Sequence, residues 1–351
     1  MKNKSLNSIA WRKFKNDKFA VVSLIFIIIL IFISIFPYFF ITDKSPYANE
    51  QNLSIRLHPP GTEITFIKVP RDNFKEQKLI YSLFFGFESE YKSIPISSFQ
   101  KTREGISFQL YDSEEIVFYN NTNYKIIFRN YFIGTDRYGR DLLSRIILGT
   151  RVSLSIGFIA VIISLIIGVL LGSLAGYYRG RLDNIIMWLV NVIWSIPTLL
   201  MVIAITLALG KGFWQVFIAV GFTMWVEVAR VVRGQVIAER EKEYVNAAKS
   251  LVYSDFRIIL RHILPNIFGP IFVISAANFA SAILIESGLS FLGIGAQMPI
   301  PSWGGVIKDH YNYIFMDKAY LAIFPGLAII FSVFSFMLLG NGLRSSLDVK
   351  N

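Results

Sequence analysis

Six apolar stretches, each long enough to cross a lipid bilayer, constrain what this chain can fold into. They lie at about residues 19–36, 152–178, 185–209, 213–232, 266–290 and 319–340. A helix that spans the hydrocarbon core needs ~20 predominantly apolar residues, because its backbone polar groups must be satisfied within the segment. The 351-residue chain is 54% hydrophobic and only 17% charged, unlike a soluble globular protein. The pattern predicts an all-α membrane protein with six transmembrane helices.

The first apolar run follows several basic residues, as the apolar part of a cleaved signal peptide also does. The run from Phe19 to Phe36 is longer than a signal peptide needs, and it ends in Phe36-Pro37-Tyr38 rather than in small residues. We therefore expect a retained first span.

Lysine and arginine are distributed unevenly over the predicted connections, and this asymmetry predicts the orientation. The two termini and the 179–184 and 230–264 connections hold about half of the 35 basic residues. The short connections on the other side carry Lys211, Lys308 and Lys318. By the positive-inside rule, both termini and the 240–264 loop are expected in the cytoplasm. The net charge of +11 reflects this asymmetry and implies no nucleic-acid partner.

Residues 43–132 separate the first two apolar runs and have a different composition. Runs of β-branched and aromatic residues lie at 62–69, 105–111, 115–119 and 124–129, between clusters of Gly, Pro, Asn and Asp. Such runs predict strands. We expect a β-rich extracytoplasmic insert, so the chain divides into 1–42 (cytoplasmic N-terminus and first helix), 43–132 (insert) and 133–351 (five-helix core).

The connection after the fourth span contains a charged, two-piece amphipathic segment, 246–265. Apolar side chains recur at helical spacing before a polar break at 253–255: Tyr244, Ala247, Ala248, Leu251 and Val252. A second stripe follows the break: Phe256, Ile259, Leu260, Ile263 and Leu264. Neither piece can span a bilayer, so we expect two short helices at the membrane surface, the second capped by Ser254 and Asp255. A solvated connector with helical propensity is the alternative.

This segment resembles the loop by which permease subunits of bacterial ABC importers contact their ATPases. The family pattern is Glu-Ala-Ala, three residues, Gly, nine residues, then Ile-x-Leu-Pro. The matching residues are Ala247, Ala248, Leu264 and Pro265, and the departures are Asn246, Val252 and His262. The resemblance implies ATPase coupling by Tyr244, Asn246, Ala247, Ala248, Leu251, Val252, Leu264 and Pro265. Small side chains at Ala247 and Ala248 would let the helix sit deep in an ATPase groove.

Val252 stands where the family has Gly, and this departure bears on the turn between the two helices. A Gly at a helix end usually supplies a positive φ, which a β-branched residue tolerates badly. The sequence therefore predicts a turn here and leaves its geometry open.

A second motif, GTDRYGRDLLSR, begins at Gly134. Its start looks like a phosphate loop, but Arg140 and Asp141 stand where nucleotide binding needs Lys and Ser or Thr. The segment instead resembles the GTDxxGRDxxSR signature of the second permease of oligopeptide and dipeptide ABC importers. The matching residues are Gly134, Thr135, Asp136, Gly139, Arg140, Asp141, Ser144 and Arg145. We expect an amphipathic helix over 137–151 at the outer interface, with Arg and Asp facing water.

The C-terminal half carries further elements of the same resemblance. ESGLSFLGIGAQMPIPSWGG, from Glu286 to Gly305, is similar to the LSFLGxG and PSWG elements of that subunit, and GNGLRSSLD closes the match at Asp348. The resemblance implies the type I ABC importer permease fold, one half of a heterodimeric pore for oligopeptide or dipeptide uptake, and the bacterial cytoplasmic (inner) membrane.

The same resemblance implies no catalytic centre, cofactor or metal on this chain. ATP and Mg²⁺ would be used by two cytoplasmic ATPase subunits. The other implied partners are a homologous second permease, an extracytoplasmic peptide-binding protein and the lipid bilayer. The insert would help to receive the binding protein or stiffen the outer gate, or it would be a structural cap.

Other functions share part of this pattern. Importers of nickel chelates, glutathione and peptide antibiotics carry the same motifs, so the substrate stays open. A proton-coupled secondary transporter needs titratable groups near the bilayer midplane, and Glu286 is nearly alone there. An intramembrane hydrolase needs a Ser/His or paired-carboxylate constellation, and none of the three His lies in a predicted span.

Two glutamates lie within predicted spans. Glu286, near the outer end of the fifth span, is expected either in the translocation path or in a structural pair with an Arg or a backbone N–H. Glu227 is expected to pair with Arg230, one helical turn away.

Small and helix-breaking residues recur in the spans. Gly168, Gly172 and Gly176 predict close helix packing, and prolines predict kinks at Pro197, Pro270 and Pro325. A metal site shared by His58, His262 and His310 is not expected from the topology, and the absence of cysteine excludes disulfides and thiolate ligands.

Overall fold

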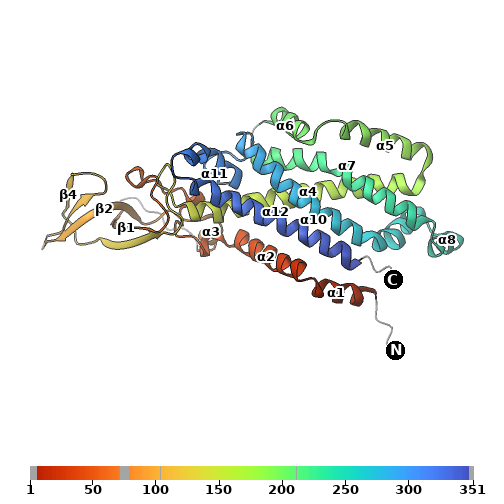
Figure 1. The fold of residues 1–351 in the computed structure, drawn as a ribbon, viewed down its shortest axis with the longest axis horizontal. Coiled ribbons are helices and arrows are strands. Elements are labelled where there is room, and N and C mark those ends of the chain that lie inside the picture. The colour runs from red at the N-terminus through yellow and green to blue at the C-terminus, as the bar shows by residue number, and fades with distance from the viewer. Residues whose placement is uncertain (1–5, 72–78, 103, 211, 348–351) are drawn as a thin grey trace. The chain divides into compact units, whose positions relative to one another are not determined.

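The computed structural model describes residues 6–71, 79–102, 104–210 and 212–347. The chain divides into two compact units (Figure 1). The first, which we call the helical unit, comprises Met1–Leu30, Ser153–Ala296 and Ile329–Asn351. The second, which we call the β unit, comprises Ile31–Val152 and Gln297–Ala328 and contains the 43–132 segment.

Long apolar helices make up most of the chain. A short helix α1 (Leu6–Asn16) precedes the first of them. In the described residues, the helices with the length and composition of membrane spans are α2 (Lys18–Ile35), α4 (Leu142–Tyr178), α7 (Phe213–Arg240), α10 (Phe268–Phe291) with the turns that lead into it, and α12 (Tyr320–Leu347). Helices α5 (Gly180–Trp194) and α6 (Thr198–Leu209) form a pair bent by 89°, which makes a sixth crossing when counted as one span. The prediction of a six-helix membrane protein is confirmed.

Prolines act differently at the three predicted kinks. Pro197 lies in the break between α5 and α6, because proline lacks an N–H and clashes with the preceding helical turn. Pro325 lies inside α12. Pro270 lies in the first turn of α10, where proline is tolerated, so it interrupts no regular helix.

Glycines on α4 allow that helix to approach α7 closely. A Cβ at Gly168 would lie 2.5 Å from Val228 Cβ, and one at Gly172 would lie 2.5 Å from the carbonyl oxygen of Ala229. A Cβ at Gly176 would lie 2.8 Å from the carbonyl oxygen of Arg233. Real Cβ contacts are not this short, so the packing predicted from the glycine spacing is confirmed.

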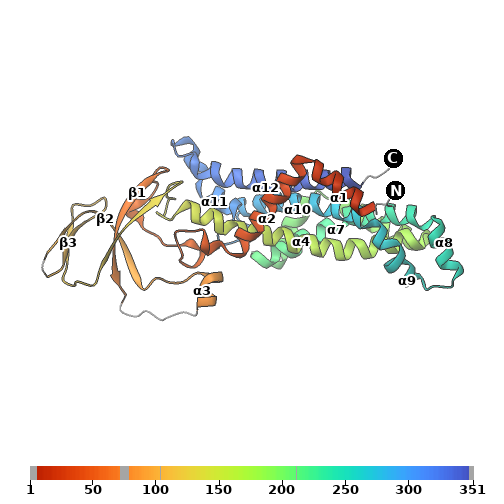
Figure 2. The same ribbon diagram turned by 90° about the horizontal axis from the view of Figure 1, so that it is seen from below.

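The β unit is built on a five-stranded antiparallel sheet (Figure 2). Its strands are β1 (Thr62–Pro70), β2 (Tyr91–Lys101), β3 (Ile106–Leu110), β4 (Ile116–Tyr119) and β5 (Lys125–Tyr131), in the order β4-β3-β2-β1-β5. The unit also contains the helices α3 (Leu79–Phe85) and α11 (Trp303–His310). The β-rich character of the insert and four of its strands are confirmed.

Strand β2 was not predicted, because its sequence lacks the usual strand pattern. It contains Pro95, and proline is normally confined to edge strands and bulges since it donates no ladder hydrogen bond. Here Pro95 pairs with Phe66 of β1, and the ladder to β3 shifts register between Ile96 and Ser98. The carbonyl of Pro95 still accepts the N–H of Tyr111 at 3.1 Å. The nearby irregularity explains how a central strand accommodates proline.

The sheet buries side chains on both faces. Ile64 and Phe66 of β1 pack with Ile55 and Tyr131 in one cluster. Ile67 points to the opposite face, because side chains alternate along a strand. It packs there with Ile96, Ile106 and Phe108. Two small cores therefore stabilise the insert.

Three charged residues of the GTDRYGRD motif, Asp136, Arg140 and Asp141, are buried and Arg137 is half-buried, which corrects the prediction that Arg and Asp face water. Asp136 and Arg140 are 0% and 1% exposed and form an ion pair at 2.6 Å between Oδ2 and Nε. Asp141 accepts a hydrogen bond from Thr42 Oγ1 at 2.5 Å. No separate interfacial helix forms over 137–151, since α4 begins at Leu142 and continues into the span. The motif joins the start of α4 to residues 42–58.

Close backbone contacts explain why this motif contains glycine. Gly139 has φ +71°, and a Cβ there would lie 1.8 Å from the carbonyl oxygen of Asn52. The PSWG element packs against the same helix, since Trp303 is buried and its Nε1 donates to the carbonyl of Ile146 at 3.0 Å. Both motifs therefore have structural roles.

Candidate functional site

The candidate functional site is the connection between α7 and α10. It contains α8 (Glu243–Ser250) and α9 (Asp255–Ile258). From α9 the chain continues through a π-helical turn (Ile259–Ile263) and a 3-10 turn (Leu264–Ile267) into α10. The two predicted short helices are present, and the second leads directly into a span.

One face of this connection packs against the helices of its own unit. The buried residues Val245, Ala248, Ile258, Ile259 and Ile263 cluster with Tyr177 of α4 and with Val232 and Val236 of α7. Full burial of one such aliphatic side chain stabilises a fold by ~1.5–3 kcal/mol. The loop is therefore a packed structure rather than the solvated connector considered as the alternative.

The opposite face exposes apolar side chains, which we call the loop patch. Leu251, Val252 and Phe256 are 66%, 88% and 72% exposed. Ala247 and Leu260 are exposed beside them. Exposed apolar groups gathered in this way mark interaction sites.

The other predicted coupling residues fall on different surfaces. Ala248 is 4% exposed and belongs to the internal cluster, so it does not face outward as its neighbour Ala247 does. Asn246 and Pro265 are exposed, whereas Tyr244 and Leu264 are partly buried. The coupling role of all eight residues remains a prediction.

Phe256 and Leu260 belong to the loop patch but were not among the predicted site residues. Their stripe in the sequence also contains Ile259 and Ile263, which are buried. Both faces of this helical stretch are apolar, so the spacing alone does not distinguish the inward face from the outward face. The inward face is the one that packs against α7, so only the position of α7 in the fold distinguishes the two faces.

The turn after α8 keeps the geometry that the family's Gly would supply. Val252 has φ +57°. Its N–H donates to the carbonyl of Lys249 at 2.9 Å, and the N–H of Tyr253 donates to the carbonyl of Ala248 at 3.2 Å. This is the Schellman pattern of a helix C-terminus. A β-branched residue in this conformation is strained by ~1–2 kcal/mol.

Polar contacts fix the loop to the ends of α7 and α4. Tyr244 donates to Glu239 Oε2 at 2.5 Å and accepts from Asn266 Nδ2 at 3.1 Å, so it bridges the end of α7 and the turn before α10. Burial and the hydrogen bond to Glu239 raise the pKa of Tyr244 to about 12, so this donor stays protonated. Tyr177 at the end of α4 donates to Asp255 Oδ1 at 2.7 Å. Ser254 occupies the N-cap position of α9, but its hydroxyl makes no capping hydrogen bond, in contrast to the prediction.

Glu286 is fully buried in α10 of the helical unit. Its carboxylate accepts hydrogen bonds from Ser153 Oγ at 3.0 Å and Ser290 Oγ at 2.7 Å. The contact with Ser153 links α10 to α4. A role for Glu286 in the translocation path remains a prediction.

Glu227 and Arg230 do not form the predicted ion pair. The Arg230 guanidinium lies 3.5 Å from the ring centre of Trp194 and donates to Asn191 Oδ1 at 3.1 Å. The described residues include no ion pair of Glu227. A cation–π contact and an amide acceptor on α5 therefore hold the arginine.

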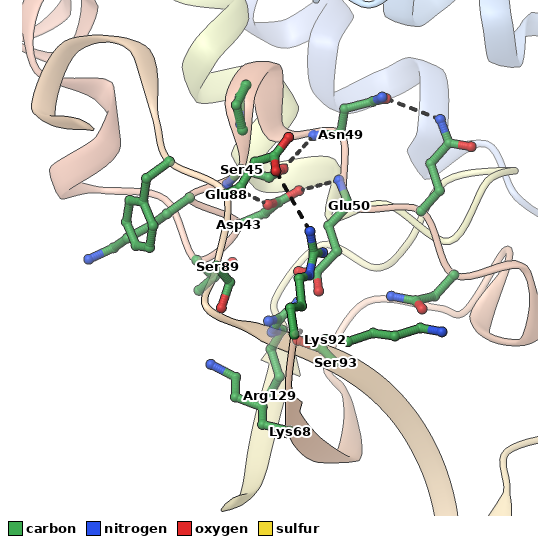
Figure 3. A pocket seen from close by; sticks show the side chains of 17 residues that line it. Asp43, Ser45, Asn49, Glu50, Lys68, Glu88, Ser89, Lys92, Ser93 and Arg129 are labelled. Atoms are coloured by element: carbon green, nitrogen blue, oxygen red, sulfur yellow. Dashed lines mark hydrogen bonds and ion pairs between the residues drawn. The ribbon is translucent and has the colours of Figure 1, made fainter. Parts of the chain in front are cut away.

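The β unit contains a polar cavity of about 500 Å³ (Figure 3). Lys68, Lys92 and Arg129 line it together with Asp43 and Glu50. Two of these charges are already paired, since Arg129 Nη1 lies 2.9 Å from Glu50 Oε2. Burial raises the pKa of Asp43, whose carboxylate accepts two backbone N–H groups.

Within the described ranges, no group of three or more His, Asp or Glu side chains is arranged to hold a metal ion. The three histidines lie on separate elements. His58 precedes β1, His262 lies in the π-helical turn and His310 ends α11.

The sequence matches two family profiles. Residues 168–350 match the binding-protein-dependent transport system inner membrane component family. This match covers more than half of the chain and includes the candidate site. The chain belongs to this family. Residues 5–60 also match the N-terminal transmembrane domain of oligopeptide transport permease C.

Individual relatives agree with this assignment. The chain is 39% identical over 220 residues to a glutathione transport system permease protein, GsiD, of Pectobacterium atrosepticum, covering 63% of this chain and 73% of that protein. It is 40% identical over 221 residues to the dipeptide permease DppC of Bacillus subtilis, covering 63% and 69%. It is 38% identical over 222 residues to the oligopeptide permease OppC of the same organism, covering 63% and 72%.

A solved structure supports the fold. The inward-facing MetNI methionine ABC transporter, in its native crystal form, aligns with a TM-score of 0.50 at 14% identity and covers 58% of this chain and 97% of that chain. This likeness shows the fold alone. The predicted resemblance to an ABC importer permease and its type I fold are therefore confirmed. The chain is a membrane-embedded permease subunit.

Proposed function

We propose that this permease forms half of the translocation pore of an ATP-driven importer of oligopeptides or dipeptides. A homologous permease would complete the pore, and two cytoplasmic ATPase subunits would use ATP and Mg²⁺. An extracytoplasmic binding protein would deliver the peptide. The relatives named for dipeptides and oligopeptides support this substrate class.

The observation that carries the coupling role is the two-faced loop between α7 and α10. Its inner face is packed onto α4 and α7, and its outer face leaves Leu251, Val252 and Phe256 exposed. An ATPase that contacts the loop patch would bury these side chains. Because Tyr244 bridges Glu239 and Asn266, movement of the loop would be transmitted to α7 and α10 together.

A pair of neighbouring substitutions tests this proposal. Ala247→Glu places a charge on the exposed face, where it would be desolvated only when an ATPase docks. We expect it to abolish peptide-stimulated ATP hydrolysis while the purified permease keeps its thermal stability. Ala247→Ser is the matched control and should retain stimulation. Ala248→Glu buries a charge inside the chain, so it should lower stability before any ATPase is added.

Normal stimulation in the Ala247→Glu transporter would refute docking at the loop patch. Loss of stability in that variant would show that Ala247 belongs to the chain's own core.

Glutathione is a second candidate substrate, because a glutathione permease protein is among the relatives at 39% identity. The complete transporter in liposomes distinguishes the two. We expect di- and oligopeptides to stimulate ATP hydrolysis at lower concentrations than glutathione. The reverse order would favour the second candidate.

We further propose that both termini and the loop patch lie in the cytoplasm of a bacterium, with the permease in the inner membrane and the insert outside. Ser98 on β2 and Ser250 at the end of α8 are both exposed. Single cysteines at these positions, in a chain without cysteine, should react with an impermeant reagent from opposite sides. Reaction of both from the outside would contradict the orientation.

The insert is proposed to receive the binding protein, and a structural cap is the alternative. Gly61 and Tyr131 are joined by a 2.9 Å backbone hydrogen bond, so a short Gly/Ser connector can replace 62–130. This cut leaves residues 42–58 and their contacts with Asp136 and Asp141 in place. We expect weaker binding-protein affinity in nanodiscs with unchanged ATPase assembly. An unchanged affinity for the binding protein would refute the docking role and favour the structural cap.

A further inference from the structure

A cavity in the helical unit is lined by an ionisable side chain on a membrane-spanning helix. The cavity measures about 290 Å³ and is walled by parts of α5, α6, α7 and α10. Its lining includes Trp194, Thr198, Thr223, Glu227 and Ser281. Glu286, which the sequence singled out, does not line it.

Glu227 is exposed and unneutralised near the middle of α7. No hydrogen bond or ion pair to its carboxylate occurs among the described residues. Arg230, the nearest cation along the helix, is held by Trp194 and Asn191 instead. An ionisable group on a spanning helix is costly against lipid, so such groups face water or protein.

A broken span reaches the same cavity. The 89° bend between α5 and α6 leaves residues 195–197 outside regular helix, and these residues are exposed. Ile196 of this break and Thr198 at the start of α6 line the cavity. Irregular backbone at membrane depth is tolerated only where protein buries it or where it lines a water-filled space.

The remaining lining is suited to a passing solute. Ser281 and Thr198 expose hydroxyl-bearing side chains, whereas Ile193, Met201 and Leu284 provide apolar walls. A single carboxylate among such groups attracts a positive charge, and this attraction is stronger beside low-dielectric protein than in bulk water.

We propose that this cavity is part of the path along which the substrate crosses the membrane, and that Glu227 receives the positively charged amino group of a peptide in transit. The peptide part of this inference rests on the proposed function. The carboxylate would select for a free amino terminus, and the apolar walls would accept different side chains.

The first experiment compares tri-alanine with N-acetyl-tri-alanine as transport probes. The complete transporter, with its partner subunits and binding protein, is reconstituted in liposomes as wild type, Glu227→Gln and the control Glu63→Gln, which removes an exposed carboxylate in β1. We expect the ratio of free to acetylated peptide uptake to fall at least tenfold in Glu227→Gln and to stay unchanged in Glu63→Gln. An unchanged ratio in Glu227→Gln would overturn the proposal.

The second experiment needs no substrate, so it separates failure of this inference from failure of the proposed function. In the assembled complex, Ser281→Cys provides one thiol in this chain. The thiol at position 281 is reacted with positively and with negatively charged methanethiosulfonate reagents, and each reaction rate is followed by the mass of the chain. Each rate is divided by the rate of the same reagent with Ser98→Cys.

We expect the positive reagent to be favoured at least tenfold at position 281, and this preference to vanish when Glu227→Gln is added. No labelling, or equal normalised rates in the presence of Glu227, would overturn the cavity assignment. The comparison of the two reagents in the presence of Glu227 tests the cavity assignment even if the Glu227→Gln variant fails to assemble. Absence of peptide uptake in wild type, with the labelling preference present, would instead refute the peptide substrate.

Discussion

Replacing Asp136 by Asn should destabilise the β unit strongly, because the carboxylate is the centre of a buried hydrogen-bond cluster. Its Oδ1 accepts the N–H groups of Tyr138 and Arg140 at 2.8 and 3.0 Å, and its Oδ2 accepts Arg140 Nε at 2.6 Å. Asn can retain the first two contacts. Its amide nitrogen would then face Arg140 Nε, so that two donors meet. The Arg140 guanidinium, which is 1% exposed, would also lose its countercharge.

Loss of one partner of a buried ion pair costs ~3–5 kcal/mol. Each ~1.4 kcal/mol is a factor of ten in an equilibrium constant. Amides whose acceptors lie in this motif report the opening locally: Asn52 donates to the carbonyl of Tyr138, and Leu57 donates to that of Asp136. We expect their hydrogen exchange in nanodiscs to accelerate about a hundredfold or more.

A matched control is available in the same unit. Arg71 and Glu88 are 47% and 69% exposed and lie 3.8 Å apart, and such surface pairs contribute ~0–1 kcal/mol. Glu88→Gln should therefore change exchange at 52–58 by less than about fivefold. If Asp136→Asn behaves like Glu88→Gln, the structural interpretation of the GTDRYGRD motif is refuted.

Three further predictions concern packing, strain and pH. Gly172→Ala should lower the thermal midpoint, since its Cβ would meet the Ala229 carbonyl at 2.5 Å and overpacking costs ~1–3 kcal/mol; Gly234→Ala, whose Cβ meets nothing within 4 Å, should not lower it. Val252→Gly should slow exchange of the Tyr253 amide, because relief of ~1–2 kcal/mol of strain exceeds the ~0.5–1 kcal/mol entropic cost of Gly; faster exchange would contradict the strain. Burial lowers the pKa of His310 below its ordinary 6.5, so acidification from pH 7.5 to 5.5 protonates the unfolded chain first and should destabilise the β unit. His310→Gln should flatten that dependence, and an equally steep profile would exclude His310 as its source.

Local patterns in the sequence were enough to predict most elements of the fold. Apolar runs of bilayer length predicted the spans, since lipid forces each span to satisfy its own backbone. Four strands were predicted from alternating β-branched and aromatic residues. Strand β2 was missed because Pro95 is acceptable there only beside the register shift between Ile96 and Ser98, which depends on the neighbouring strand.

The candidate site was also predicted only in part, because local patterns show which helices form but not which of their faces is buried. Helical spacing placed α8 and α9, because amphipathic periodicity is a local property. The difference between Ala247, exposed, and Ala248, buried, arises from where α7 and α4 lie.

Charged residues mark the limit of sequence reasoning most clearly. The sequence by itself determined a six-span membrane protein with a β-rich insert and an amphipathic loop, because each follows from composition and periodicity. Its motifs, and not these patterns, carried the resemblance to a permease. Tertiary structure alone decided that Arg140 is buried with Asp136, while Glu227 is left exposed with no hydrogen bond or ion pair to the residues that the structure describes. A charge can be buried when an opposite charge and hydrogen bonds compensate its lost hydration, and those partners are brought together only by the fold.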